Sequence, residues 1–209
     1  SIIPLYYIYI ETMKKIYAFD FDGTLTKRDS LIAFLLFAKD WKEFVKCFTL
    51  HLHLLIAMKI GIIDSGKVKE KIFGYYFKGM PETMFNDLCE KFALKHQHIL
   101  RAKGIEKIRE ALNEEDSTVM IVSASINNWV APFFKDMPEI EIFCTRVEVK
   151  DGNLTGKFLS ANCRRAEKVR RILALHPDRQ KYYLIAYGDS SGDIEMLDFA
   201  DKGYYKPFR

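Results

Sequence analysis

Cysteine is scarce in this sequence, and the few cysteines lie far apart. Four occur among 209 residues, at Cys47, Cys89, Cys144 and Cys163, and no two of them form a CxxC pair. A dense disulfide framework of the kind that stabilises small secreted domains is therefore excluded. We expect free thiols and a reducing compartment, the cytoplasm.

A long uncharged run is also missing. In the most apolar stretch, residues 44–63, Lys46 and Lys59 enclose only twelve uncharged residues, whereas a membrane-spanning helix needs about 20. The stretch therefore indicates a buried or interfacial helix. An interfacial helix would add a weak contact with a membrane surface, so a location peripheral to the membrane is the alternative to a purely cytoplasmic one.

A strong excess of one charge is lacking as well. The formal net charge is +4, and the densest basic cluster is the short run RRAEKVRR at residues 164–171. Nucleic-acid binding normally requires a larger basic patch, so we expect no nucleic-acid partner. The sequence indicates no protein partner either.

The first residues do not resemble a secretory signal. SIIPLYYIYIETMKK is apolar for about ten residues, and its lysines follow the apolar part, which reverses the order of a signal peptide. We expect Met13 to be the natural start and residues 1–12 to be an N-terminal extension. An additional edge strand is the alternative.

Strands alternating with helices fill the second half of the chain. The pattern predicts helices over 104–115, from 127, and over 166–176 and 192–200, strands over 118–125, 141–145 and 182–190, and a hairpin over 147–158. A buried strand at 15–20 precedes them. Such alternation is typical of an α/β fold, in which helices cover both faces of a parallel sheet.

The residues between the first strand and this region indicate helices only. The expected segments are 29–39, 41–60, 64–78 and 81–98, with Asp64 as an N-cap. Because the strand at 15–20 belongs with the later α/β half, the helices form an insertion. We therefore expect an α/β core of residues 13–29 and 100–209 and a helical domain of residues 30–99.

Polar side chains gather where the predicted strands end. They are Asp20, Asp22 and Thr24, then Ser123, then Asp189 and Asp193, with Lys168 near the start of a helix. In a parallel sheet, ligands bind beyond the carboxyl ends of the strands. Two carboxylates as close as Asp20 and Asp22 repel each other, and each favours its neutral form unless a cation offsets the charge. A divalent metal is therefore expected at this edge.

These motifs resemble those of the haloacid dehalogenase superfamily, in the branch that includes phosphoserine phosphatase. The resemblance covers nearly the whole chain from Lys15. DFDGTLT matches the first motif, VSAS the second, Lys168 the third and GDSSGD the fourth. It implies a Rossmann-like parallel sheet with an inserted, all-α helical cap, here residues 30–99. It also implies hydrolysis of a phosphate monoester.

The resemblance further implies a role for each motif residue. Asp20 would be the nucleophile that forms an aspartyl-phosphate, and Asp22 the general acid and then the general base. Mg²⁺ would bind Asp20, the backbone carbonyl of Asp22, and Asp189. The phosphate would be held by Ser123, Ala124, Lys168, Gly23 and Thr24. Asp193 would orient Lys168 or the waters of the metal.

The chain departs from the phosphoserine phosphatase pattern in ways that concern the substrate. Ala124 and Ser125 replace two glycines, Gly192 replaces an asparagine, and Asp29 replaces the glutamate that meets the substrate amine. No arginine lies between Arg28 and Arg101 to grip a carboxylate. Large apolar residues are common in the cap: Phe34, Phe37, Phe44, Phe48, Phe73, Tyr75, Tyr76 and Phe77. Any that faced the site would favour an apolar leaving group, so phosphoserine is predicted to be a poor substrate.

The sequence thus predicts a Mg²⁺-dependent phosphatase for a small organic phosphate. Two alternatives keep this chemistry: a lipid phosphatase of the phosphatidylglycerophosphatase type, which the apolar cap favours, and a phosphoserine phosphatase. A third alternative is a non-catalytic phosphate-binding module. The presence of both Asp20 and Asp22 counts against it.

Overall fold

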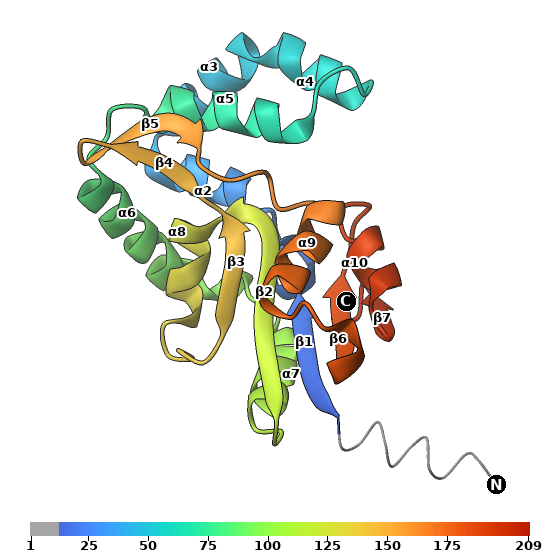
Figure 1. The fold of residues 1–209 in the computed structure, drawn as a ribbon. Helices are drawn as coiled ribbons and strands as arrows, with labels where there is room; N and C mark the ends of the chain where they lie inside the picture. Colours follow the sequence, from blue (N-terminus) through green and yellow to red (C-terminus); the bar gives the residue numbers. More distant parts are fainter. Residues whose placement is uncertain (1–12) are drawn as a thin grey trace, which may run out of the picture.

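The computed structural model describes residues 13–209, so the predicted extension over residues 1–12 lies outside the described residues. Its centre is a five-stranded parallel sheet (Figure 1). In spatial order the strands are β3 (Glu141–Thr145), β2 (Ser117–Ile126), β1 (Lys14–Phe19), β6 (Tyr182–Gly188) and β7 (Lys202–Tyr205). The predicted α/β fold is confirmed. The pattern did not indicate β7, which is a short, mostly exposed edge strand.

Helices cover both faces of the sheet. Along β1 the side chains alternate, because successive residues of a strand point to opposite faces. Tyr17 and Phe19 pack in the core that includes α7 (Ala102–Leu112) and α8 (Asn127–Val130). Ile16 and Ala18 pack in the core that includes α9 (Ala166–Leu175) and α10 (Ile194–Phe199). The carboxyl ends of β1, β2 and β6 are thus held rigidly side by side.

Between β1 and β2 the chain forms only helices, as predicted. They are α2 (Ser30–Ala38), α3 (Trp41–Leu50), α4 (Leu52–Lys59), α5 (Ser65–Phe77) and α6 (Glu82–Lys95), with the short turns η1 (Phe21–Leu25) before them and η2 (Gln97–Ile99) after them, and then α7 of the sheet layer. Figure 1 shows α3 and α4 farthest from the sheet, with α5 below them. No described helix has the length and apolar character that crossing a membrane demands.

One predicted helix is in fact two. The expected segment 41–60 breaks at His51, which has a ψ of 9° and separates α3 from α4. A ring nitrogen of His51 lies 2.8 Å from the carbonyl oxygen of Cys47. The break is local, because the His51 amide still donates to the Cys47 carbonyl at 3.0 Å, and hydropathy alone does not reveal it. Elsewhere the caps follow the sequence, since Asp64 accepts a hydrogen bond from the Gly66 amide at 2.8 Å.

Aromatic rings join the inserted helices to the α/β part. Phe34 of α2 packs 5.1 Å from Phe92 of α6, 5.6 Å from Phe77 of α5 and 4.8 Å from Trp129 of α8, centroid to centroid. Edge-to-face and offset ring pairs of this kind stabilise a core beyond the area that they bury. The hydrophobic core is therefore continuous from the sheet into the helices. The domain boundary at residues 30–99 stays a prediction.

The predicted hairpin over 147–158 is confirmed as strands β4 (Val147–Lys150) and β5 (Asn153–Phe158). It lies against α5, and the β5 backbone binds the helical segment. The Gly79 amide donates to the Leu154 carbonyl at 2.8 Å, and the Phe158 amide donates to Glu70 at 2.7 Å. The hairpin, although it lies between β3 and α9 in sequence, thus supports the helices that cover the carboxyl ends of the strands. Two short helices, η3 (Ala131–Phe134) and η4 (Arg179–Lys181), complete the fold.

Gly156 on the hairpin offers a test of this support. A Cβ atom there would lie 2.9 Å from the Gly74 Cα of α5, and the residue has a φ of +81°. We expect Gly156→Ala to lower the free energy of unfolding by about 2–4 kcal/mol, because overpacking adds to backbone strain. Gly152 is the control, since it shares a positive φ of +75° but has open space around it.

We expect Gly152→Ala to cost only about 1–2 kcal/mol, the strain alone. Urea denaturation followed by circular dichroism measures both values. Equal losses for the two variants would show that the hairpin does not press on α5.

Candidate active site

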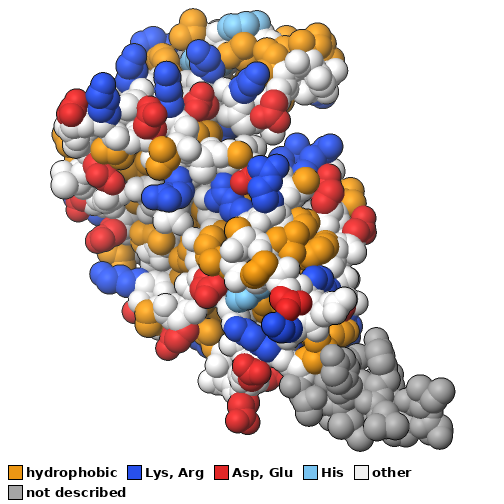
Figure 2. Space-filling model, viewed as in Figure 1, with side chains coloured by type: hydrophobic (Ala, Val, Ile, Leu, Met, Phe, Trp, Pro, Cys, Tyr) orange, Lys and Arg blue, Asp and Glu red, His pale blue; other side chains and the backbone are white. Residues whose placement is uncertain are grey.

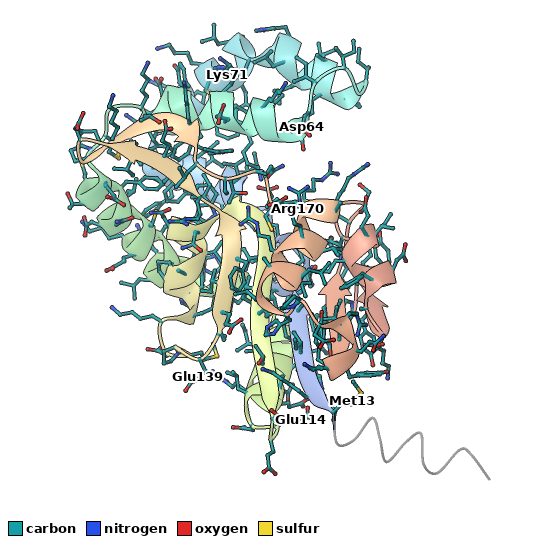
Figure 3. The ribbon with its side chains drawn as sticks, viewed as in Figure 1. Met13, Asp64, Lys71, Glu114, Glu139 and Arg170 are labelled. Atoms are coloured by element: carbon teal, nitrogen blue, oxygen red, sulfur yellow. The ribbon has the colours of Figure 1, made fainter. Side chains whose placement is uncertain are left out.

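A cavity of about 530 Å³ lies at the carboxyl end of the sheet, between the α/β part and the segment that joins α4 to α5. Figure 2 shows the molecule hollowed at this place. Figure 3 shows Asp64 at the start of α5 and Arg170 on α9 on the two sides of the opening. The cavity is lined by Asp20 and Asp22 after β1, Ser123 and Ala124 in β2, Lys168 in α9, and Asp193 after β6. Residues predicted from four separate motifs therefore meet in one place.

The centre of the cavity is an ion pair with three members. Lys168 is 1% exposed, and its ammonium group lies 2.5 Å from Asp20 and 2.6 Å from Asp193. Asp193 also accepts hydrogen bonds from the amide and the hydroxyl of Ser190. Burying a charge is costly unless it is paired and hydrogen-bonded. Asp193 therefore holds Lys168 beside Asp20 and fixes the loop after β6.

The positive charge of Lys168 does not fully offset the effects of burial and of the neighbouring carboxylates on Asp20. Burial raises the pKa of its carboxyl group to about 7, although the neighbouring Lys168 lowers the pKa. The two carboxylates of Asp193 and Asp22 raise the pKa further. Lys168 thus offsets only part of the effect of burial on Asp20, and an additional cation would further favour the ionised carboxylate.

The described residues include an acidic group that fits such a cation. Oxygen atoms of Asp20, Asp189 and Asp193 all lie within 4.8 Å of one another. Carboxylate oxygens are hard ligands of the kind that Mg²⁺ prefers. Gly23, with a φ of +79°, lets Asp189 approach, because a Cβ there would lie 2.4 Å from a carboxylate oxygen of Asp189. Arg209 donates to Asp189 at 2.5 Å in this structure.

Asp22 points into a hydrogen-bond chain instead of toward this acidic group. Its carboxylate accepts from the amide of Ser30 at 2.7 Å and from the hydroxyl of Ser125. The hydroxyls of Ser30 and Ser125 lie 3.1 Å apart, and the indole of Trp129 donates to Ser30 at 3.1 Å. Burial raises the pKa of Asp22, whereas these donors lower it. Sequence reasoning missed Ser30 and Trp129, and noted Ser125 only as a departure from a glycine.

The remaining predicted residues lie around Asp20. The Thr24 hydroxyl donates to Asp20 at 3.2 Å, and the Ser123 hydroxyl accepts from the Ser125 amide at 3.2 Å. Asp29 lines the cavity, but one of its oxygens caps α2 by accepting from Ile32. Asp29 thus lies at the site, but the helix cap already uses one of its carboxylate oxygens. Its role in specificity stays a prediction.

The aromatic residues of the inserted helices do not line the cavity. Within the described part of the chain, none of the eight aromatic residues named from the sequence lines the cavity. The apolar side chains that do line it are Met58, Ile63 and Ala124. The rings of the inner residues instead pack against one another and against Trp129. The expectation that these aromatic rings favour an apolar leaving group therefore has no support in the structure.

Three further cations do line the cavity: Lys69 of α5, and Arg164 and Arg165 just before α9. The ammonium group of Lys69 donates to the Ala124 carbonyl at 2.9 Å. Sequence reasoning looked for an arginine only in the inserted helices and missed the two from the core. Both belong to the run RRAEKVRR, which contains Lys168. Because Arg164 and Arg165 line the cavity, the lack of an arginine in the cap is not by itself a reason to expect that phosphoserine is a poor substrate.

A parallel sheet that presents a buried lysine and several aspartates at its carboxyl edge places the chain among the α/β proteins that bind their ligand at this edge. Residues 17–198 match the haloacid dehalogenase-like hydrolases, and the chain belongs to this family. Protein CicA of Caulobacter vibrioides is 33% identical over 196 residues, which cover 92% of this chain and 86% of that protein.

Solved structures agree with this assignment. A protein of unknown function from Bordetella pertussis Tohama I is 19% identical, with a TM-score of 0.78 over 93% of this chain and 89% of that chain. A phosphoserine phosphatase, solved as an analogue of its phospho-aspartyl intermediate, is 26% identical, with a TM-score of 0.61 over 93% of this chain and 86% of that chain. The predicted placement in the phosphoserine phosphatase-like branch is confirmed.

Ser125 tests the arrangement of Asp22. Its hydroxyl donates to the Asp22 carboxylate inside a buried site, and a hydrogen bond to a charged group stabilises by about 1.5–3 kcal/mol. We expect Ser125→Ala to lower kcat by about 10- to 100-fold with little change in KM, because Asp22 loses its orientation. Steady-state kinetics on a phosphate ester measure this. Unchanged kcat in a correctly folded variant would show that Ser30 alone orients Asp22.

Proposed function

We propose that this chain is a Mg²⁺-dependent phosphatase that hydrolyses a phosphate monoester through an aspartyl-phosphate. The observation that carries the proposal is the buried group of Asp20, Lys168 and Asp193 beside Asp189. Such a group holds a nucleophilic carboxylate, a phosphate-binding cation and the ligands of a metal within one cavity.

Asp20 is the nucleophile in this proposal. One carboxylate oxygen attacks phosphorus, the phosphorus–oxygen bond to the leaving alcohol breaks, and an acyl phosphate forms on Asp20. Lys168 lies 2.5 Å from Asp20, where its positive charge meets the negative charge that spreads over the phosphoryl oxygens. Asp193 keeps Lys168 in that position.

Asp22 moves the proton in both halves of the reaction. Burial raises the pKa of Asp22, which favours the protonated form that the first half needs. Asp22 donates its proton to the leaving alkoxide and then, as carboxylate, takes a proton from the water that attacks the aspartyl-phosphate. Free phosphate and the original state of Asp20 result.

The other residues bind and orient. Ser123, Ala124, Gly23 and Thr24 are proposed to hold the phosphate oxygens together with Lys168. Asp20, Asp189 and the backbone carbonyl of Asp22 would hold Mg²⁺, with Asp193 near it. When bound, Mg²⁺ supplies positive charge to the phosphate and keeps Asp20 ionised at neutral pH.

A small organic phosphate is the proposed substrate class, and phosphoserine belongs to it. The four cysteines are free and buried, which agrees with a cytoplasmic location.

A lipid phosphate is the second candidate, because apolar side chains of α3 and α4 and of the adjoining turn are exposed: Trp41, Val45, Leu50, Leu52, Ile56, Ile60 and Ile62. They would rest on a membrane surface. Rates on water-soluble and on micellar phosphate esters separate these candidates.

The role of Asp20 has a direct test. We expect Asp20→Asn to reduce phosphatase turnover below about 1% of the unmodified chain, because an amide cannot form the acyl phosphate. Asp178→Asn is the matched control, since Asp178 lies on the surface and forms its ion pair with Lys181, outside the cavity. Rates on a panel of phosphate monoesters, with circular dichroism to confirm folding, measure the effect. More than a tenth of the original turnover in Asp20→Asn would refute the assignment.

The metal requirement is tested by chelation. We expect excess chelator to abolish turnover, Mg²⁺ to restore it, and Ca²⁺ to inhibit it, because the larger and looser shell of Ca²⁺ misplaces the nucleophile. Mg²⁺ should also raise the thermal midpoint of the unmodified chain and have a weaker effect on Asp189→Asn. Full turnover in excess chelator would contradict the proposal.

A further inference from the structure

The basic run around Lys168 contains four arginines, and the structure divides them into two pairs. Arg170 and Arg171 lie three and four residues after Glu167 on α9, and their guanidinium groups bind its carboxylate at 2.9 and 3.1 Å. Arg171 also donates to the Cys144 carbonyl at 2.6 Å. The second pair of arginines is therefore occupied by contacts within the protein.

The first pair faces the cavity. Arg164 and Arg165 precede α9 and line the same space as Asp20 and Lys168. Arg164 donates to the neutral hydroxyl of Ser191 at 3.1 Å. Across residues 13–209, neither guanidinium group has a carboxylate within ion-pair distance. Two permanent positive charges thus border the site without a negative partner from the described residues.

The backbone is arranged to hold this pair. Arg165 adopts a φ of 54° and a ψ of −130°, a conformation that costs a residue with a side chain about 1–3 kcal/mol. Its amide donates to the Gly192 carbonyl at 2.8 Å. A Cβ at Gly192 would lie 2.9 Å from Nε of Arg164. The glycine that replaces the asparagine of phosphoserine phosphatases therefore leaves room for the Arg164 guanidinium.

The other cations of the cavity have partners. Lys168 is held by Asp20 and Asp193, and Lys69 donates to the Ala124 carbonyl. Burial lowers the pKa of Lys69, the carboxylates of Asp22, Asp29 and Asp20 oppose that change, and repulsion by Arg164 adds a smaller lowering. An anion between Arg164 and Lys69 would relieve that repulsion.

We propose that Arg164 and Arg165 form a second anion site, so that the substrate is a phosphate monoester that carries a further negatively charged group. This inference rests on the proposed phosphatase function, because it places the scissile phosphate at Asp20 and Lys168. The planar guanidinium fork binds two oxygens of a carboxylate or phosphate at once. The further group is thus a carboxylate in a small phosphorylated acid or a phosphodiester in a lipid headgroup.

A second cavity, of about 690 Å³, offers the competing place for that group. It shares Asp22, Asp29 and Ser190 with the first cavity and is bordered by Arg28, Arg101 and Arg209. Arg209 already pairs with Asp189, and Arg101 donates to the Thr26 carbonyl at 3.0 Å. Substitution of Arg28 therefore tests whether the further group binds in the second cavity instead.

Matched substrates and variants test the proposal. 3-Phosphoglycerate is compared with glycerol 3-phosphate, which replaces the carboxylate by a neutral CH₂OH group. In micelles, a phospholipid with a terminal phosphomonoester beyond a phosphodiester is compared with phosphatidate. The variants are Arg164→Gln and Arg165→Gln, alone and together, with Arg170→Gln as the control that removes the same charge from outside the cavity.

We expect the unmodified chain to prefer the doubly anionic member of at least one pair by about tenfold or more in kcat/KM. The double variant should lose about 10- to 100-fold on that member, mostly through KM, and less than threefold on its neutral partner. Arg170→Gln and Arg28→Gln should leave both rates within threefold. The soluble and micellar pairs reveal which source supplies the further group.

Binding to the Asp20→Asn chain keeps this test separate from the proposed function. Calorimetry with 3-phosphoglycerate, or with the diester lipid in micelles, should show affinity that depends on Arg164 and Arg165 even without turnover. Equal losses on both members of a pair, losses in Arg28→Gln instead, or no preference for the charged member would overturn the second anion site. Absence of turnover on every ester, with arginine-dependent binding intact, would refute only the phosphatase.

Discussion

The buried ion pair of Lys168 with Asp20 and Asp193 is the interaction on which the rest of the structure depends. Three ionised groups leave water together, so each needs the others within hydrogen-bond distance. Strand β1 delivers Asp20, the first turn of α9 delivers Lys168, and the loop after β6 delivers Asp193. A parallel sheet is the scaffold that brings these three segments to one edge.

The site is completed from outside the sheet. The hairpin β4–β5 presses on α5 through Gly156 and Gly74, and α5 in turn brings Lys69 to the Ala124 carbonyl. Trp129, packed on Phe34, donates to Ser30 and so holds the hydrogen bonds around Asp22. The aromatic core therefore sets the position of the acid, and changes far from the cavity can alter the chemistry within it.

Charge in the cavity is arranged in two parts. The inner part adjoins the group of Asp20, Asp189 and Asp193, whose carboxylate oxygens lie within 4.8 Å of one another. The outer part contains Arg164 and Arg165, which have room for an anion. Gly23 and Gly192 make both arrangements possible, because a side chain at either position would overlap Asp189 or Arg164. A substrate with negative charge at both ends complements this distribution.

The sequence by itself determined the alternation of strands and helices and the motif residues Asp20, Asp22, Lys168, Asp189 and Asp193, because hydropathy periods and short motifs are local. Only the tertiary structure decided which other residues reach the cavity. The aromatic residues of the helices, Phe34 among them, turn inward to the core, and Arg164 takes the space over Gly192. Contacts between residues far apart in sequence decide these positions, and no local pattern encodes them.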